Sequence, residues 1–276
     1  MVDATQNLVS KFVADIRASS KYRFICRETV KDVIIQELAN HSRPKDALRI
    51  ARERLHRLWA QFLGEPDYIK STTELSVAFE AEDAAMIEGA CSKILHSHAS
   101  TRERMPEIEE FYRTIFSKTG IPSKISDLAC AFGPFAFRRM GLPRSVKYHA
   151  YDINQRIVDL INVYFGLEDI EPLAAIRDVL CSTPGEQVDV AFLLKMYHCL
   201  EHRKRGAGWR VVEAAQANWI VVSFPTKNLR GQFADIVANY ESHILSKSVS
   251  QAWQCFRLNF ASETVLLIDK RSSYEQ

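Results

Sequence analysis

Polar residues stand directly after several apolar segments that are predicted to be strands. Asp152, Asp178 and Lys195 each follow such a segment, and the turn at residues 223–227 follows a fourth. In open parallel α/β sheets the ligand lies across the carboxyl ends of the strands. A carboxylate placed like Asp152 can accept hydrogen bonds from both hydroxyls of a ribose. The pattern therefore predicts a nucleoside site at this edge of a sheet.

The turn after the first predicted strand, residues 125–129, consists mostly of small residues. It reads Ala-Cys-Ala-Phe-Gly-Pro over residues 129–134. Small side chains let a ligand approach the backbone closely. Gly133 is the single glycine of this turn, so it is not the G-x-G-x-x-G fingerprint of dinucleotide sites. We therefore expect one adenosine-type ligand rather than a dinucleotide.

Each of these polar residues also has a structural interpretation. Asp152 could cap the helix predicted from Asn154 onward, a role compatible with ligand binding. Asp178 is as consistent with a cap or turn as with a ligand contact. Lys195 could simply be solvated, although it ends a largely apolar strand. These alternatives stay open at the level of the sequence.

Other chemistries have weaker support. Cys91, His96 and His98 resemble a metal set, but His96 and His98 are two residues apart and do not share a helix face. No metal is therefore expected. Cys130 has apolar neighbours, which favour a buried structural thiol over a nucleophile. The sequence contains neither a phosphate-binding P-loop nor a G-x-S-x-G elbow.

From residue 125 onward, strands and helices alternate. Strands are predicted at 125–129, 146–151, 173–176, 188–194 and 219–223, and a closing hairpin at 252–258 and 264–268. This order predicts an α/β fold, a mostly parallel, doubly wound Rossmann-like sheet with an antiparallel C-terminal hairpin. That ending is typical of S-adenosylmethionine-dependent methyltransferases.

The first hundred residues show helical periodicity and no predicted strand before residue 124. Helices are predicted at 8–18, 27–38, from Pro44 to about 63, and 73–95. Residues 100–103 read as a capping box that starts a further helix. We therefore predict a helical N-terminal domain, residues 1–98, and a methyltransferase-type domain, residues 99–276.

Charge is unevenly distributed although the net charge is only +2. Residues 1–60 carry 12 Lys and Arg against 7 Asp and Glu. Lys45, Arg49 and Arg52 share one helix face, and Arg54 and Arg57 lie nearer its apolar border. This face predicts a polyanionic partner, with a solvated helix surface as the equal alternative.

Composition favours a cytoplasmic globular protein. The chain is 47% hydrophobic, and its six cysteines include no C-x-x-C pair, as expected for reduced thiols. No apolar run reaches the length of a membrane span, and the N-terminus lacks the features of a secretion signal. We expect no membrane partner.

Four segments together carry a resemblance to a known family. They are His-Ala-Ser-Thr-Arg-Glu-Arg at 98–104, Asp-Leu-Ala-Cys at 127–130, Leu-Leu-Lys-Met at 193–196 and Ser-Phe-Pro-Thr-Lys at 223–227. In this order and spacing they resemble the aminoglycoside-resistance 16S ribosomal RNA guanine-N7 methyltransferases. The resemblance implies S-adenosylmethionine as cofactor and a helical domain that docks on the small (30S) ribosomal subunit. It also implies a decoding-site guanine of 16S rRNA as target, whose methylation blocks 4,6-disubstituted deoxystreptamine drugs.

The resemblance also implies roles for individual residues. Arg104 would grip the methionine carboxylate of the cofactor, and Asp152 would hold its ribose. Lys195 would face the methyl-transfer side as the catalytic residue. The other implied cofactor contacts are His98, Ala99, Ser100, Ala129, Asp178, Val179 and Leu194. The implied rRNA contacts are Lys45, Arg49, Arg52, Arg54, Arg57 and Lys227.

The chain departs from the family pattern in three places. Residues 131–134 read Ala-Phe-Gly-Pro where members usually read G-x-N-P, and residues 234–236 read Ala-Asp-Ile where they read K-G-M. A position usually held by Gln, near Arg203 and Lys204, is basic. Two alternatives therefore remain: a methyltransferase of the same fold with another RNA base or a small molecule as substrate, or a catalytically silent RNA-binding protein.

The chemistry of guanine N7 fits the absence of an obvious catalytic base. N7 carries an in-plane lone pair, so no proton need be removed before it attacks the methyl group. Catalysis would then rest on alignment, which can contribute roughly 7–11 kcal/mol. Trp59, Phe132 and Tyr197 are candidates for stacking on the target base once it leaves its own stack.

Overall fold

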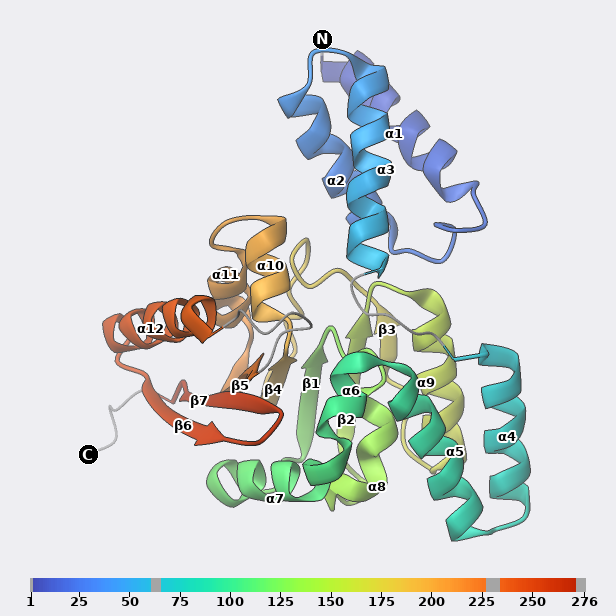
Figure 1. Ribbon diagram of the computed structural model, residues 1–276, viewed down its shortest axis with the longest axis vertical. Coiled ribbons are helices and arrows are strands. Elements are labelled where there is room, and N and C mark those ends of the chain that lie inside the picture. The colour runs from blue at the N-terminus through green and yellow to red at the C-terminus, as the bar shows by residue number, and fades with distance from the viewer. Residues whose placement is uncertain (1, 61–65, 227–233, 272–276) are drawn as a thin grey trace.

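The computed structural model describes residues 2–60, 66–226 and 234–271, and their centre is a seven-stranded sheet (Figure 1). The strand order is β3-β2-β1-β4-β5-β7-β6. The first five strands of that order run parallel, and β7 and β6 pair antiparallel at one edge. The bounds are β1 Lys124–Leu128, β2 Lys147–Asp152, β3 Ala174–Ile176, β4 Val188–Leu194, β5 Ala217–Pro225, β6 Gln254–Asn259 and β7 Glu263–Asp269. The predicted α/β fold with its antiparallel hairpin is confirmed.

Helices cover both faces of the sheet, and β4 shows why. Val190 and Phe192 pack into one hydrophobic cluster, whereas Ala191 and Leu193 pack into another. Successive side chains of a strand point to opposite faces, so a strand buried on both sides is apolar throughout. The first cluster includes α7 Ile108–Thr119, α8 Phe137–Met140 and α9 Gln155–Leu167. The second includes α10 Tyr197–Arg203, α11 Ala207–Ala214 and part of α12 Ala234–Ser250.

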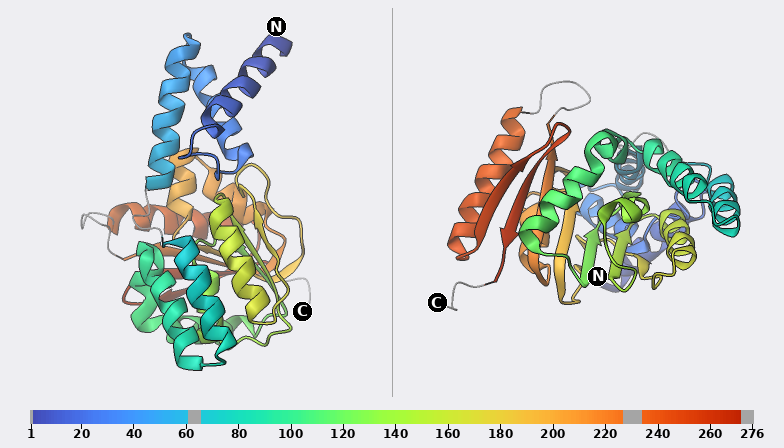
Figure 2. Two further views of the ribbon diagram at one scale, coloured as in Figure 1. Left: turned by 90° about the vertical axis from the view of Figure 1, so that its right-hand side faces the viewer. Right: turned by 90° about the horizontal axis from the view of Figure 1, so that it is seen from below.

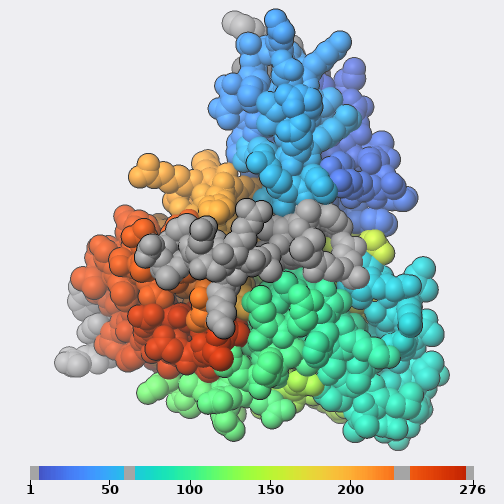
Figure 3. Space-filling view, in the orientation of Figure 1, coloured from blue at the N-terminus to red at the C-terminus, as the bar shows by residue number. Residues whose placement is uncertain are grey.

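The N-terminal helices belong to two different cores. Helices α1 Val2–Arg17, α2 Arg27–Asn40 and α3 Pro44–Ala60 enclose a hydrophobic cluster of their own. Helices α4 Tyr68–Glu80 and α5 Ala84–Ser97 instead pack into the cluster on one face of the sheet. Figure 1 shows α1–α3 as a lobe beyond the carboxyl ends of the central strands, and Figure 3 shows the same lobe projecting from the surface. The hydrophobic core thus divides between α3 and α4, earlier than the predicted domain boundary at residue 98.

Two local predictions in this region are wrong. The single helix predicted over residues 73–95 is interrupted at Glu82, whose φ is 51°. Asp83 then caps α5 by accepting hydrogen bonds from the backbone N–H groups of Ala85 and Met86. The capping box at Ser100 does not form either. Helix α6, Ala99–Arg104, already contains Ser100, and Glu103 pairs instead with Lys195, directly after β4.

A short antiparallel bridge joins the lobe to the sheet. Ile25 pairs with Asn154, directly after β2. Figure 2 shows the lobe standing over this end of the sheet from a second side. Among the residues that the structure describes, no helix is both long and apolar enough to cross a bilayer.

Candidate active site

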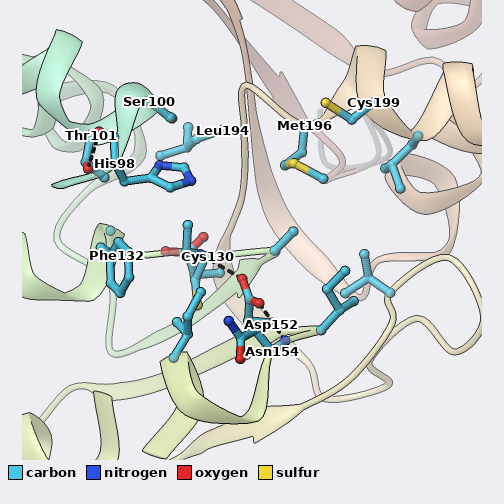
Figure 4. Close-up of a pocket in the computed structure, with 18 of the residues that line it drawn as sticks. His98, Ser100, Thr101, Cys130, Phe132, Asp152, Asn154, Leu194, Met196 and Cys199 are labelled. Atoms are coloured by element: carbon cyan, nitrogen blue, oxygen red, sulfur yellow. Dashed lines mark hydrogen bonds between the residues drawn. The ribbon is translucent and has the colours of Figure 1, made fainter. Parts of the chain in front are cut away.

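A cavity of about 270 Å³ opens at the carboxyl ends of β1, β2 and β4 (Figure 4). This is the edge at which the sequence predicts a nucleoside site. Its lining comes from the α5–α6 junction, the turns after β1 and β2, the segment after β3, and α10. The lining residues include His98, Ser100, Arg104, Asp127, Ala129, Cys130, Phe132, Asp152, Asn154, Ile157, Asp178, Val179, Leu194, Met196, Cys199 and Arg203. Leu58 of α3 also belongs to the lining, so the N-terminal lobe contributes to the cavity directly.

Most of the predicted cofactor residues meet at this cavity. Eight of them line it: His98, Ser100, Arg104, Ala129, Asp152, Asp178, Val179 and Leu194. They come from five segments that lie apart in the sequence. Ala99 and Lys195 are not among the lining residues that the structure describes. Eight of the nine predicted cofactor residues therefore lie together at one cavity, and Ala99 is the exception.

Asp152 is held in place by backbone amides at the tip of β2. Its Oδ2 accepts from the N–H of Ala131 at 3.1 Å, and its Oδ1 accepts from the N–H of Asn154 at 2.8 Å. The interpretation of Asp152 as the N-cap of α9 is wrong, because Asn154 caps that helix through a bond from the Arg156 N–H. Asp152 is instead a fixed carboxylate that lines the cavity.

The turn after β1 has an unusual backbone. Ala129 and Ala131 have φ values of 64° and 45°, a region that glycine adopts more readily. The second of these is the position where the resembling family has glycine. Its N–H nonetheless reaches Asp152, so the turn keeps its hydrogen bond to the β2 carboxylate. The side chain of Ala131 therefore does not prevent this contact.

Two buried carboxyl groups of the site have raised pKa values. Burial raises the pKa of Asp127 to about 7, although Tyr148 donates a hydrogen bond to its Oδ2 at 2.9 Å. Burial likewise raises the pKa of Asp152 to about 6, against the lowering effect of its backbone donors. Near neutral pH both groups therefore stand close to the protonation equilibrium. A cationic ligand in the cavity would favour their charged forms.

His98 is a neutral group at the same site. Burial, together with the positive charges of Arg102 and Lys195, lowers its pKa to about 4. Its ring meets the ring of Phe132 edge to face at 5.8 Å. The imidazole is therefore uncharged at pH 7 and forms part of an apolar wall.

Arg104 is already paired within the chain. Its Nε and Nη2 donate to the two carboxylate oxygens of Glu263 on β7 at 2.5 and 2.9 Å. Both side chains are buried, and the guanidinium lies over the Phe111 ring at 4.5 Å. Arg104 lines the cavity as half of a buried ion pair, and its contact with the methionine carboxylate stays a prediction. Glu263 could not be predicted as this partner, because the two residues are 159 positions apart.

Lys195 belongs to the same charged network. Its Nζ lies 2.8 Å from Glu103 Oε2 and 4.0 Å from Glu263 Oε1, and it donates to the Ser100 carbonyl at 3.4 Å. The side chain is only 4% exposed, so the interpretation as a solvated lysine is wrong. Its backbone N–H donates to the Ser223 hydroxyl, which joins the ends of β4 and β5. Lys195 therefore lies behind the lining formed by its neighbours, and its catalytic role stays a prediction.

Asp178 combines the two roles left open by the sequence. Its Oδ1 accepts from the Leu180 N–H at 3.0 Å, as in a turn, and the residue also lines the cavity. Its Oδ2 accepts from the Thr29 hydroxyl of α2 at 2.6 Å. Arg203 forms an ion pair with the same oxygen at 2.5 Å. Neither Thr29 nor Arg203 was predicted to belong to the site.

The predicted rRNA contacts differ in their surroundings. On α3 the exposed ones are Lys45, Arg49, Arg52 and Arg57. Arg54 is half-buried and pairs with Glu37 and Gln36 of α2, which gives it a structural role. Lys227 and the side chains of residues 59 and 234–236 lie outside the described residues. The exposed basic face therefore consists of Lys45, Arg49, Arg52 and Arg57, a set called the α3 basic face below.

Cys130 and the stacking candidates Phe132 and Tyr197 are all buried. Cys130 is buried, and burial raises the pKa of its thiol well above the usual value, which agrees with a structural cysteine. Of the stacking candidates, Phe132 lines the cavity, whereas Tyr197 packs edge to face on Phe224 and Tyr240. In the part of the chain that the structure describes, no three His, Cys, Asp or Glu side chains cluster as a metal site would require.

Comparison with known proteins identifies the family. The ribosomal RNA methyltransferase (FmrO) family matches residues 18–268. A 16S rRNA (guanine(1405)-N(7))-methyltransferase of Micromonospora rosea is 30% identical over 272 residues, which cover 98% of this chain and 97% of the relative. The solved 16S rRNA methylase RmtB superposes with a TM-score of 0.79 at 28% identity, over 95% of this chain and 98% of its own. The 16S rRNA methyltransferase RmtF in complex with S-adenosyl-L-homocysteine gives 0.78 at 27% identity, over 95% and 97%. The chain is therefore a member of the FmrO family of ribosomal RNA methyltransferases.

Proposed function

We propose that this protein transfers the methyl group of S-adenosylmethionine to N7 of a decoding-site guanine of 16S rRNA in the small ribosomal subunit. The target is the one named for its relatives, guanine 1405. The observation that carries the proposal is the cavity at the carboxyl ends of β1, β2 and β4, with Asp152 fixed at its edge. The expected consequence is resistance to 4,6-disubstituted deoxystreptamine drugs. We expect the protein to act in the cytoplasm, where its ribosomal substrate is.

The donor set of the cavity fits S-adenosylmethionine. Asp152 offers a carboxylate for the ribose hydroxyls, and Ile157 and Val179 offer apolar contacts for the adenine. Asp127 is a buried acid whose charged form a cationic amino group would favour. When bound, the cofactor supplies an electrophilic methyl group on a positively charged sulfur. The side chains of this cavity would therefore bind and orient it rather than exchange protons with it.

The cavity residues His98, Phe132 and Leu194 are consistent with catalysis by orientation of the reacting groups. Guanine N7 needs no general base, and neutral His98 with Phe132 and Leu194 would exclude water from the reacting atoms. Orientation of this kind can contribute roughly 7–11 kcal/mol to lowering the barrier. Lys195, anchored by Glu103 and the Ser100 carbonyl, would hold the α6 segment against the end of β4.

The α3 basic face would bind rRNA phosphates. Its members are exposed on α3. The lobe that contains α3 projects from the rest of the molecule (Figure 3). Phosphate contacts fix the position of a protein on RNA without reading sequence. We propose that α1–α3 form the unit that docks on the subunit, so that the target base is presented at the cavity.

Methyl transfer from labelled S-adenosylmethionine tests the proposal. The purified chain should label 16S rRNA in intact small subunits, and label protein-free rRNA much more weakly, because docking needs the folded subunit. Labelling of protein-free RNA alone, or of a small molecule, would instead support a methyltransferase with another substrate. Cofactor binding without any label in rRNA would identify a catalytically silent homologue.

A further inference from the structure

The lobe formed by α1–α3 is attached beside the cofactor cavity at several points. The Cys26 N–H donates to the Ile153 carbonyl at 2.7 Å, and the Gln155 N–H donates to the Phe24 carbonyl at 2.9 Å. Ile153 and Gln155, the residues that make these bonds, stand on either side of Asn154 and just after Asp152 in the chain. Leu58 of α3 adds an apolar side chain to the cavity lining. The backbone that carries the ribose-binding carboxylate is therefore bonded to the lobe.

Arg203 connects the same two parts through its guanidinium. Its Nη2 lies 2.6 Å from Asp32 Oδ2 on α2, and its Nη1 lies 2.5 Å from Asp178 Oδ2 in the cavity. The Thr29 hydroxyl of α2 donates to that same oxygen of Asp178 at 2.6 Å. Arg54 of α3 donates to the backbone carbonyl of Arg203 at 3.3 Å. One carboxylate of the cavity is thus oriented by one side chain from α10 and one from α2.

Because Arg203 and Asp178 are buried, the loss of any one partner changes the electrostatic environment of the others. The side chains of Arg203 and Asp178 are 5% and 2% exposed, whereas that of Asp32 is 28% exposed. Removing one member of a buried ion pair leaves the other charge without compensation. A change on α2 therefore alters the environment of Asp178 even though neither Thr29 nor Asp32 lines the cavity.

We propose that Arg203 is a positioning residue that ties α2 to Asp178, so that the lobe and the cofactor cavity are energetically coupled. The coupling rests on the proposed function only in that the ligand of the cavity is S-adenosylmethionine. Cofactor binding stabilises the lobe in the arrangement seen here, and the lobe in that arrangement strengthens cofactor binding. This reciprocity follows from linkage between two binding equilibria.

Two conservative changes on α2 test the coupling without altering the cavity lining. Asp32→Asn removes the charge that faces Arg203, and Thr29→Val removes the hydroxyl that faces Asp178. Coupling of this kind can change affinity by up to roughly thirtyfold, and we expect S-adenosylmethionine to bind at least about threefold more weakly to each variant. Calorimetry on the isolated full-length chain measures this affinity.

Matched variants separate coupling from general damage. Thr29→Ser keeps the hydroxyl, and Asp15→Asn makes the same charge change at an exposed position of α1. Both should keep the wild-type affinity. If Asp32→Asn and Thr29→Val bind the cofactor within about threefold of the wild type, the network is only a structural ion pair and the proposal is overturned, whatever their melting temperatures.

A measurement on the wild-type chain covers the case in which a variant fails to fold. Hydrogen exchange of the amides of α2, Arg27–Asn40, should slow when S-adenosylmethionine is added. Unchanged exchange in α2, with slower exchange around the cavity, would overturn the coupling. None of these experiments contains ribosomal subunits. A chain that shows the coupling but does not methylate rRNA would therefore contradict the proposed function alone.

Discussion

Replacing Glu263 by Gln should strongly destabilise the folded chain, because it leaves two buried cations with too little compensating charge. Glu263 accepts two hydrogen bonds from Arg104 and lies 4.0 Å from the Lys195 amine. Its side chain is fully buried, and those of Arg104 and Lys195 are 2% and 4% exposed. In the variant the half-exposed Glu103 would be the acid that remains beside Lys195.

The size of the effect follows from this burial. Removing one partner of a buried ion pair costs about 3–5 kcal/mol, because the remaining charge has lost both its water and its counter-charge. For a chain of this size that corresponds to a fall of roughly 6–20 °C in Tm. Burial alone would raise the pKa of Glu263, but the charge of Arg104 and its hydrogen bonds lower it. The stabilisation is therefore present at neutral pH and is lost as the pH falls through the pKa of Glu263 in the folded state.

Denaturant unfolding followed by circular dichroism measures the difference in free energy of unfolding between wild type and variant. Glu109→Gln, an exposed position on α7, is the matched control and should stay close to the wild type. The difference for Glu263→Gln should shrink in acid, where the wild type itself loses the charge. A variant within about 1 kcal/mol of the wild type at neutral pH would refute the reasoning.

Three further outcomes concern cofactor and rRNA binding. S-adenosylmethionine should bind more weakly to the wild type as the pH falls below about 7, because Asp127 and Asp152 become protonated. Calorimetry at several pH values measures this affinity, and its dependence on pH should be smaller in Asp127→Asn. The stability of the chain without cofactor should depend on pH in the opposite direction. Because the pKa values of both carboxyl groups are raised in the folded state, the free energy of unfolding should fall as the pH rises towards neutral. Asp152→Ala should lose roughly 1.5–3 kcal/mol of cofactor binding, about ten- to hundredfold in calorimetric affinity, and unchanged affinity would remove it from the site. Filter binding of subunits should weaken, with a reduced salt slope and unchanged cofactor affinity, when Glu replaces three members of the α3 basic face, Lys45, Arg49 and Arg52.

Sequence patterns predicted the sheet well because its central strands β4 and β5 are distinct apolar segments between turns. The parallel order also brings Asp152 and Asp178 to one edge, as expected for strands that share a direction. The interruption between α4 and α5 was missed, because apolar periodicity continues across it. Asp83 was the available signal, since aspartate is a strong N-cap.

The partners of the site residues could not be predicted in the same way. Arg104 and Glu263 are 159 positions apart, and Asp178 and Thr29 are 149 positions apart. Such pairs depend on how the layers pack, which local periodicity does not contain. The sequence shows a basic position near Arg203 and Lys204 where the family usually has Gln, but it does not predict the ion pairs of Arg203. Two acidic partners, Asp32 and Asp178, explain how the positive charge of Arg203 is buried.

The central claim is the identity of the methylated atom, and mapping of the modified nucleotide tests it most directly. Small subunits incubated with the chain and S-adenosylmethionine can be treated by reduction and aniline, which cleaves RNA at N7-methylguanine, and the cleavage site located by primer extension. We expect one new stop at guanine 1405 of 16S rRNA, the position named for the relatives, and its absence without cofactor. Methylation at another nucleotide, or at another atom of that guanine, would contradict the account.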